Sequence, residues 1–201
     1  MSYEITLQSI EPLTHDVNRL VFDKPDGFSF KRGQATDFAL IRDGWEDEER
    51  PFTFTSDPDA DHLEFVIKSY PDHDGVTVRI ADMTPGDTAK IADPWGAIRD
   101  KGPGVFIAGG AGITPFIPIL RQRAEKDRIA GCTLIFGNKT ADDIILKNEW
   151  VKMKGLGVQF VLSEGDSNQY RTGMIDKELL AETISDWSQF FYVCGPDPMV
   201  E

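Results

Sequence analysis

The sequence has 201 residues, of which 40% are hydrophobic, and it carries a formal net charge of −13 at pH 7. This acidic balance opposes nucleic acid and anionic lipid as partners, because both require a positive surface. No apolar run approaches the roughly 18 residues of a membrane span, and the first residues show no export signal. Two cysteines are too few for a disulfide framework, a zinc site or an iron–sulfur cluster. We therefore expect a cytoplasmic protein of two domains of about 100 residues each, without a metal, that binds neither nucleic acid nor membrane.

The segment from Tyr3 to about Ala92 predicts a small antiparallel β-barrel or sandwich. Short runs of strand-like residues are separated by turn signals such as Pro25-Asp26-Gly27 and Thr84-Pro85-Gly86-Asp87. One short helix is expected at Val76–Met83. The residues after the N-terminus already alternate like a strand, and the further expected strands are Asn18–Phe22, Ala35–Ile41, Pro51–Thr55, Leu63–Ser69 and Thr88–Ala92.

The segment Arg50-Pro51-Phe52-Thr53-Phe54-Thr55-Ser56 is the candidate site of this half. Strand alternation places Phe52 and Phe54 on one face, and Thr53 and Thr55 on the other. Taken alone, this is the pattern of an ordinary half-buried strand with Arg50 as a surface charge. The acidic run just before it, residues 46–49, is interpreted as a solvated loop without a function.

Apolar strands alternate with helical stretches after Lys101-Gly102-Pro103-Gly104, which predicts right-handed βαβ units and a parallel sheet. We place the domain boundary there, with an antiparallel β-barrel in residues 1–101 and an α/β domain in residues 102–201. The strands expected in the α/β domain are Val105–Ala108, Thr133–Phe136, Val158–Leu162 and Phe190–Val193, and the helices run through 121–123, 144–153 and 177–184.

A glycine loop follows the first strand of the α/β domain. The glycines within Gly109-Gly110-Ala111-Gly112 permit a sharp turn and a close approach to a ligand. Thr114 is expected to cap the next helix and Pro115 to occupy its first turn. The unpaired amides at a helix start attract an anion, so this loop is a candidate phosphate site. A plain strand-to-helix turn is the alternative interpretation.

Ligands bind beyond the carboxyl ends of the strands in an open parallel sheet. Cys194 lies at one such end, and we favour a place in the ligand crevice for it over the alternative of a small core residue. The four strand ends that the sequence indicates are Gly109–Thr114, Gly137-Asn138-Lys139, Ser163-Glu164-Gly165 and Cys194-Gly195-Pro196-Asp197.

Taken together, these segments resemble the ferredoxin–NADP reductase superfamily, and more narrowly its bacterial flavodoxin/ferredoxin reductase-like flavoproteins. That family joins an antiparallel flavin-binding barrel to a nicotinamide-binding α/β domain. Its flavin motif, Arg-x-Tyr-Ser/Thr, is matched by Arg50-Pro51-Phe52-Thr53. The resemblance implies that Arg50 binds a flavin phosphate, that Phe52 packs on the isoalloxazine without the hydroxyl of tyrosine, and that Thr53 hydrogen-bonds near N5.

Two more segments of the barrel half match the family. Phe65-Val66-Ile67-Lys68 corresponds to the strand that lines the flavin. Asp74-Gly75-Val76-Thr77 corresponds to a glycine-to-hydroxyl motif at a short helix, with the glycine shifted by one residue, which implies a phosphate contact through Thr77 and the Val76 amide. FAD is favoured over FMN, because the amides at this helix start are suited to bind a pyrophosphate.

The α/β half matches the family's nicotinamide motifs. Gly110-Ala111-Gly112-Ile113-Thr114-Pro115 fits the pattern Gly-x-Gly-x-Thr-Pro, and Cys194-Gly195-Pro196 fits the final motif, whose cysteine lies close to the nicotinamide. The strand-end residues Gly137 and Asp197 are expected at the same cofactor. NADP-specific members place serine and arginine at the end of the third strand, whereas Ser163-Glu164 stands here and favours NADH over NADPH. Lys139 or Arg171 is the alternative source of a positive charge for NADPH.

The resemblance implies an NAD(P)H-dependent flavin oxidoreductase with Thr53 and Cys194 as catalytic residues. Hydride passes from nicotinamide C4 to flavin N5, and single electrons pass on to a separate flavodoxin, ferredoxin or oxygenase component. We expect a monomer whose C-terminal end is truncated, because the family continues beyond the position of Glu201 to a residue that covers the flavin. The alternatives are a reductase component of a multicomponent oxygenase and a non-catalytic flavin- or nucleotide-binding module of a larger complex.

Overall fold

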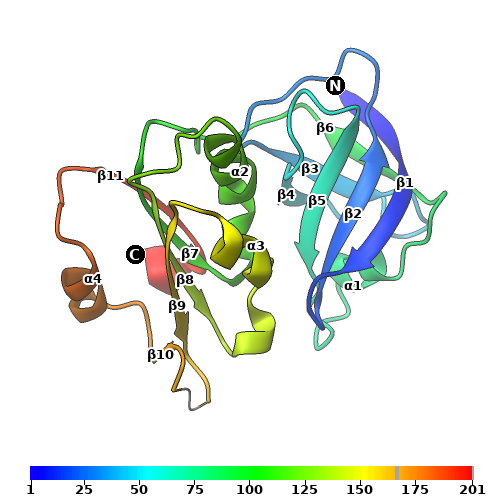
Figure 1. Ribbon diagram of the computed structural model, residues 1–201. Helices are drawn as coiled ribbons and strands as arrows, with labels where there is room; N and C mark the ends of the chain where they lie inside the picture. The colour runs from blue at the N-terminus through cyan, green and yellow to red at the C-terminus, as the bar shows by residue number, and fades with distance from the viewer. Residues whose placement is uncertain (166–167, 201) are drawn as a thin grey trace. The chain divides into compact units, whose positions relative to one another are not determined.

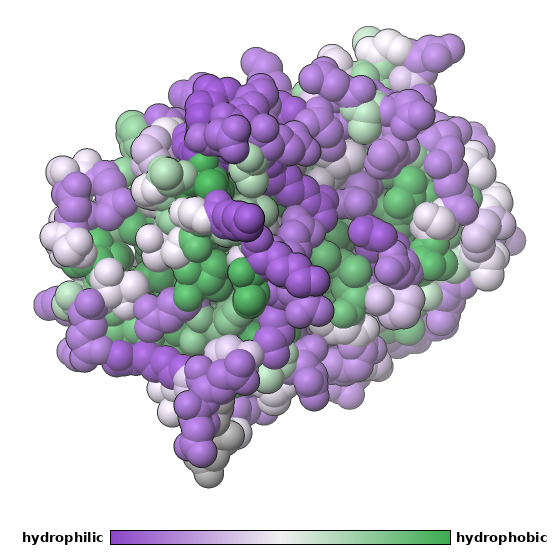
Figure 2. All heavy atoms as spheres, in the orientation of Figure 1, coloured by the Kyte–Doolittle hydropathy of each residue, from purple (hydrophilic) through white to green (hydrophobic). Residues whose placement is uncertain are grey.

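The computed structural model describes residues 1–165 and 168–200. The chain separates into two compact units, one of Met1–Asp100 with Ile117–Ile119 and one of Lys101–Phe116 with Leu120–Glu201, of which Asp166, Ser167 and Glu201 lie outside the described residues. Hydrophilic side chains cover most of the face shown in Figure 2, and hydrophobic side chains form separate patches on it. Within the described ranges, no helix is both long enough and apolar enough to cross a membrane.

The first unit is built on a six-stranded antiparallel sheet with the order β4-β3-β6-β1-β2-β5 (Figure 1). The sheet nearly closes on itself, because a bridge between Phe54 and Phe65 brings the chain after β4 beside β5. The predicted antiparallel barrel is therefore confirmed. The predicted helix is α1, Val76–Ala81. The strands are β1 Ser2–Pro12, β2 Val17–Asp23, β3 Ala35–Leu40, β4 Arg50–Thr53, β5 His62–Lys68 and β6 Thr88–Ala92.

Hydrogen bonds reinforce the closure of the barrel. The Thr55 amide donates to the Glu64 carbonyl over 2.8 Å. The Thr55 hydroxyl donates to the buried carboxylate of Glu64 over 2.8 Å, and the Glu64 amide donates to the Ser56 hydroxyl over 3.1 Å. A buried carboxylate is costly unless it is hydrogen-bonded. These bonds therefore stabilise β5 against the segment that follows β4, and they fix the position of β4 itself.

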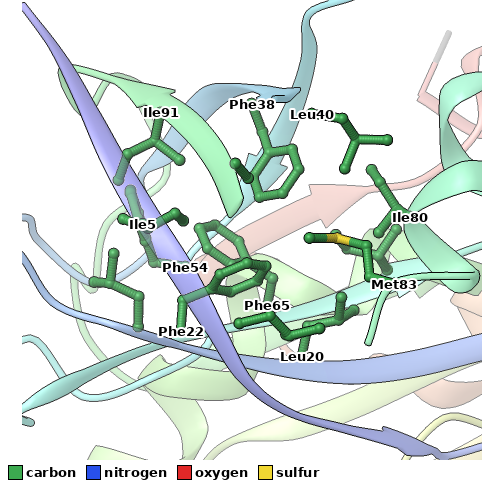
Figure 3. Close-up of a cluster of buried hydrophobic side chains, with 14 of the residues drawn as sticks. Ile5, Leu20, Phe22, Phe38, Leu40, Phe54, Phe65, Ile80, Met83 and Ile91 are labelled. Atoms are coloured by element: carbon green, nitrogen blue, oxygen red, sulfur yellow. The ribbon is translucent and has the colours of Figure 1, made fainter. Parts of the chain in front are cut away.

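Aromatic and aliphatic side chains together fill the barrel (Figure 3). Phe22, Phe38, Phe54 and Phe65 are fully buried, and Phe38 and Phe65 lie edge to face with a centroid separation of 5.7 Å. Each points inward because it occupies the inward position of an alternating strand. Edge-to-face pairs of this kind add to the free energy gained from burying apolar area.

The second unit is a five-stranded parallel sheet with the order β10-β9-β8-β7-β11 (Figure 1). Its predicted α/β architecture is confirmed. The two-residue strand β10, Arg171–Thr172, was not predicted, because it is too short to show a periodic pattern. The other strands are β7 Gly104–Gly109, β8 Thr133–Asn138, β9 Gly157–Leu162 and β11 Phe190–Cys194, and the helices are α2 Ile117–Glu125, α3 Lys147–Lys152, α4 Lys177–Thr183 and α5 Asp197–Val200, with the 3₁₀ segments η1 Gly110–Phe116 and η2 Ala141–Asp143.

Strand β7 is buried along its whole length. On one face of the sheet, Ile107 and Ile135 pack with Leu179 of α4 in an apolar cluster. On the other face, Phe106 contacts Phe116 of η1 and stacks on Tyr192 of β11. A parallel strand that is covered on both faces is apolar throughout, which explains the continuous hydrophobic run in the sequence.

The expectation of a helix that begins at Thr114 and Pro115 is wrong. These residues lie inside η1, and α2 begins at Ile117 with Pro118 in its first turn. The Thr114 hydroxyl donates to the Ala111 carbonyl over 3.0 Å, so it stabilises the tight turn and does not cap α2. Gly110 has a φ of +51°, a left-handed conformation that glycine adopts readily, and it starts this tighter winding.

Tyr192 anchors the first residues of the second unit to its sheet. Its ring stacks on Phe106 with a centroid separation of 4.3 Å. Its hydroxyl donates to the Gly102 carbonyl over 2.8 Å and accepts a hydrogen bond from the Lys101 amide over 2.9 Å.

We expect Tyr192→Phe to lower the free energy of unfolding by about 1–2 kcal/mol, because two hydrogen bonds are lost while the ring is kept. Chemical denaturation measures the change. Tyr70→Phe, at an exposed tyrosine, is the matched control, and equal stability of the Tyr192 variant and the unmodified protein would contradict this role.

Candidate functional site

The predicted site residues fall into two groups, each within one unit. The barrel half-site contains Arg50–Thr53, Val66–Lys68 and Gly75–Thr77. The sheet half-site contains Gly110–Pro115, Gly137, Ser163-Glu164 and Cys194–Asp197.

Strand β4 presents Phe52 and Thr53 at the barrel wall, and both are partly exposed. Phe52 packs against the barrel core through an edge contact with Phe38, at a centroid separation of 5.6 Å. Phe54 continues the same face into the core. Phe52 is thus held by the core while part of its ring remains open to a ligand.

Arg50 is about half exposed, and its guanidinium is engaged by the acidic run before it. One guanidinium nitrogen lies 3.0 Å from the Glu48 carboxylate, and the other donates to the Glu49 carbonyl over 2.7 Å. The run is exposed, as expected of a solvated loop, and it also supplies the partner of Arg50. The ring of Trp45, one residue before the run, lies 5.4 Å from the Arg79 guanidinium and packs against the barrel core.

Strand β5 contributes the next three residues of the barrel half-site. Val66 and Ile67 are buried, and Ile67 belongs to the barrel core. The Lys68 ammonium lies 2.6 Å from the Asp16 carboxylate, so its charge is already paired within this unit.

The start of α1 completes the barrel half-site. Gly75 is the N-cap residue, and no side chain in the described part of the chain caps this helix. The first amides of a helix have no partner within it, so a ligand oxygen can pair with them. Val76 is buried and Thr77 is partly exposed, which leaves the threonine hydroxyl accessible beside these amides.

In the sheet half-site, the glycine loop and the exit of β11 lie against each other. A Cβ atom on Gly112 would stand 2.2 Å from the Cys194 carbonyl oxygen, and one on Gly195 would stand 3.2 Å from the Gly109 nitrogen. Gly112 cannot hold a side chain without a backbone shift, whereas a Cβ on Gly195 would first meet the Met199 side chain, 2.1 Å away. The structure therefore brings together two motifs that are about 80 residues apart in the sequence, with the backbone of Gly112 against that of Cys194.

The ends of β8 and β9 form the other side of the sheet half-site. The Ser163 amide donates to the Asn138 carbonyl, and the Glu164 amide donates to the Lys139 carbonyl, both over 2.9 Å. Glu164 and Lys139 are exposed neighbours at this edge. The Arg171 guanidinium pairs with Glu182 instead, so of the two alternative cations Lys139 is the one placed beside Glu164.

Cys194 is half-buried at the end of β11. Burial raises the pKa of its thiol above the usual value, which keeps the group neutral near pH 7. A neutral thiol is a small apolar contact and not a nucleophile.

Asn138 was missed as a site residue by the sequence reasoning, which named it only as part of a strand end. It is the last residue of β8 and is buried, although the two preceding residues of the same strand face, Leu134 and Phe136, are apolar. An asparagine in line with two apolar residues at the end of a predicted strand is the signal that could have identified it.

Comparison with known proteins identifies a domain family for the second half of the chain and relatives of nearly the whole chain. Residues 106–201 match the family of oxidoreductase NAD-binding domains. The chain is 30% identical over 224 residues to NADH-cytochrome b5 reductase 2 from Mycosarcoma maydis, covering 98% of this chain and 63% of that protein. It is 29% identical over 213 residues to the reductase component of propane 2-monooxygenase from Mycolicibacterium smegmatis, covering 97% of this chain and 60% of that protein. The chain thus spans less than two thirds of these relatives.

Solved structures share the fold of the whole chain. A ferredoxin NADP+ reductase from Neisseria gonorrhoeae with bound FAD and NADP has a TM-score of 0.85 and 21% identity, covering 99% of this chain and 87% of that chain. The CS-b5R domains of human Ncb5or in the NAD+ form have a TM-score of 0.84 and 27% identity, covering 99% of this chain and 63% of that chain. With the two folds, the order of the motifs and these likenesses in agreement, the chain has the two-part fold of the ferredoxin–NADP reductases, and its second half carries an oxidoreductase NAD-binding domain.

Proposed function

We propose that this protein is an NAD(P)H-dependent flavin oxidoreductase that passes hydride from a nicotinamide to FAD and then single electrons to a separate small redox protein. The observation that carries the proposal is the presence of both half-sites in one chain, on the fold of a reductase with bound FAD and NADP. In this proposal residues 1–101 bind the flavin and residues 102–201 bind the nicotinamide. The cytoplasmic location and the monomeric state stay predictions.

The barrel half-site fits a flavin with phosphates, and FMN is the alternative to FAD. Arg50 offers a charged, exposed donor for a phosphate, and the uncapped amides after Gly75 offer neutral ones. The partly exposed ring of Phe52 offers a stacking surface, and the Thr53 hydroxyl offers a hydrogen bond near the reacting nitrogen. When bound, the flavin supplies the hydride-accepting and electron-releasing chemistry, while the protein supplies placement and electrostatics.

The sheet half-site fits a nicotinamide dinucleotide. Gly110 has a left-handed conformation, and an added Cβ there would meet no described atom within 4 Å, so this side of the loop is open. Ile113, Thr114 and Pro115 are buried and support the loop from behind. The neutral thiol of Cys194 would position the nicotinamide by contact, which a hydride transfer requires because it depends on the separation and alignment of the reacting atoms.

A second candidate differs only in the electron acceptor. The likeness to the reductase component of propane 2-monooxygenase favours an oxygenase component as the partner.

An anaerobic titration with NADH tests the reaction that both candidates share, because bleaching of the yellow protein indicates a reductase. A protein that stays yellow would contradict the proposal and indicate a non-catalytic binding module. Reoxidation of the bleached protein by a flavodoxin, a ferredoxin or an oxygenase component then separates the acceptors.

Arg50→Ala is expected to weaken flavin retention at least tenfold, because a charge-assisted hydrogen bond to a phosphate contributes roughly 1.5–3 kcal/mol. The dissociation constant of FAD, measured by fluorescence on flavin-free protein, gives the change. Arg42→Ala is the matched control, since Arg42 is an exposed arginine that pairs with Asp87 in the same unit. Full flavin occupancy of the Arg50 variant after dialysis would show that the motif is misplaced.

Glu48→Gln tests the same role of Arg50 in the opposite direction. The exposed pair with Glu48 competes with a phosphate for the guanidinium, so its removal should tighten FAD binding roughly two- to fivefold. Glu46→Gln, on the same loop, should change the affinity less. In the Arg50→Ala background, Glu48→Gln should have no effect, and an equal gain there would contradict the competition.

Cys194→Ala is expected to keep the flavin and to slow hydride transfer from NADH on the order of tenfold, because the nicotinamide loses a positioning contact. Stopped-flow measurement of flavin reduction reports the rate, and the flavin content of the purified variant is the control for folding. An unchanged rate would assign Cys194 to core filling.

NADH is expected to be preferred over NADPH, since the exposed Glu164 carboxylate repels a 2′-phosphate. Glu164→Arg should shift the ratio of the two kcat/KM values toward NADPH by on the order of tenfold, the worth of one charge-assisted contact. Arg171→Ala is the matched control, because Arg171 is paired with Glu182. A preference of the unmodified protein for NADPH would overturn this assignment and point to Lys139.

A further inference from the structure

The amide side chain of Asn138 is buried, with only 7% of the residue exposed. Its Nδ2 donates to the Phe136 carbonyl over 3.4 Å, which is long for such a bond. Its Oδ1 is fully buried and has no hydrogen-bond partner among the residues that the structure describes. Buried polar side-chain atoms are hydrogen-bonded in the large majority of cases, so an unpaired acceptor needs an explanation.

The stability of the fold does not explain why an amide side chain is buried at position 138. The preceding residues on the same face of β8, Leu134 and Phe136, are fully buried and apolar. A leucine at position 138 would continue this apolar row without an unpaired polar atom. The asparagine therefore costs stability in the isolated protein, and its benefit must come from something that binds there.

The place of Asn138 is the ligand edge of the sheet. It pairs in register with Leu162, the last residue of β9, and its neighbour Gly137 pairs with Gly109 at the end of β7. Strand β8 also contacts η1, the glycine loop. Asn138 thus ends the strand that lies between β7, which leads into the glycine loop, and β9, which leads into Ser163, at the edge where parallel sheets of this kind bind nucleotides.

The chemistry of the free atom limits what it can bind. A carbonyl oxygen accepts hydrogen bonds and repels phosphate oxygens, so its partner is an O–H or N–H group. A nicotinamide dinucleotide offers hydroxyls on both riboses. We propose that Asn138 is a further binding residue of the nicotinamide nucleotide and that its Oδ1 accepts a hydrogen bond from a ribose hydroxyl. This inference rests on the proposed function and deepens it.

Asn138→Leu is the principal test, since leucine has nearly the same size and no polar atom. The dissociation constants of NAD+ and ADP-ribose, measured by calorimetry on the flavin-loaded protein, should rise about tenfold, the loss of one well-made hydrogen bond to a ligand. The melting temperature without nucleotide should stay equal or rise. Asn148→Leu, at an exposed asparagine of α3, is the matched control and should change neither value.

The choice of probes identifies the ligand group. ADP-ribose lacks the nicotinamide carboxamide, and nicotinamide hypoxanthine dinucleotide lacks the adenine amino group, yet both keep their ribose hydroxyls. Equal losses with both probes support a ribose hydroxyl. A loss confined to nucleotides that carry the carboxamide, or confined to those that carry the amino group, would overturn the ribose assignment.

A structural role for Asn138 predicts different results. It predicts a lower melting temperature for Asn138→Leu and dissociation constants within twofold of the unmodified protein, and that outcome overturns the inference. Should the leucine variant fail to fold, the side-chain amide resonance of Asn138 in the unmodified protein decides, because ADP-ribose must shift it. Failure of the unmodified protein to bind any of these nucleotides contradicts the proposed function as well, whereas normal binding by both proteins contradicts only the role of Asn138.

Discussion

The contact between the glycine loop and the end of β11 is the constraint on which the sheet half-site depends. Gly112 lies so close to the Cys194 carbonyl that a Cβ would stand 2.2 Å from the oxygen. Because backbone meets backbone, the loop keeps its 3₁₀ winding and leaves Gly110 open on its outer side. The same contact places Cys194 beside the loop, which is the arrangement that the proposed binding of one dinucleotide requires.

The barrel supplies rigidity of another kind. Its interior packs phenylalanine rings among aliphatic side chains, and the bonds among Thr55, Ser56 and Glu64 fix the segment after β4 against β5. Strand β4 is therefore anchored at the end that follows Thr53, while Arg50 at its other end remains exposed. Precise positioning of Phe52 and Thr53 follows from the core, whereas the charge of Arg50 is held by an exposed carboxylate that solvent screens and a phosphate can replace.

Both half-sites contain polar groups whose hydrogen-bonding capacity is not fully used within the described residues. Arg50 is held only by exposed partners in the described part of the chain, where the start of α1 also has no side-chain cap. The amide oxygen of Asn138 has no partner among the described residues. These groups can therefore form further hydrogen bonds with a ligand. Such groups reduce stability slightly when no ligand is bound, and a ligand that pairs with them regains that free energy as affinity. A buried polar group that breaks the apolar pattern of its strand is expected where a protein binds a ligand.

Local pattern was enough to predict the architecture. Strand and helix periods, turn residues and the continuous apolar runs of β7 and β8 depend on neighbours along the chain, and they led to the antiparallel barrel and the parallel sheet. The likeness to a reductase superfamily was carried by short motifs instead. Tertiary structure alone decided which residues meet. The contact of Gly112 with Cys194 depends on β11 pairing beside β7, and the engagement of Arg50 depends on the fold of the acidic loop. The hydroxyl of Thr114 bonds within its own turn because Gly110 starts a tighter winding than the sequence pattern indicated. The unpaired state of Asn138 is likewise invisible in the sequence, since only the packed sheet removes its amide from water.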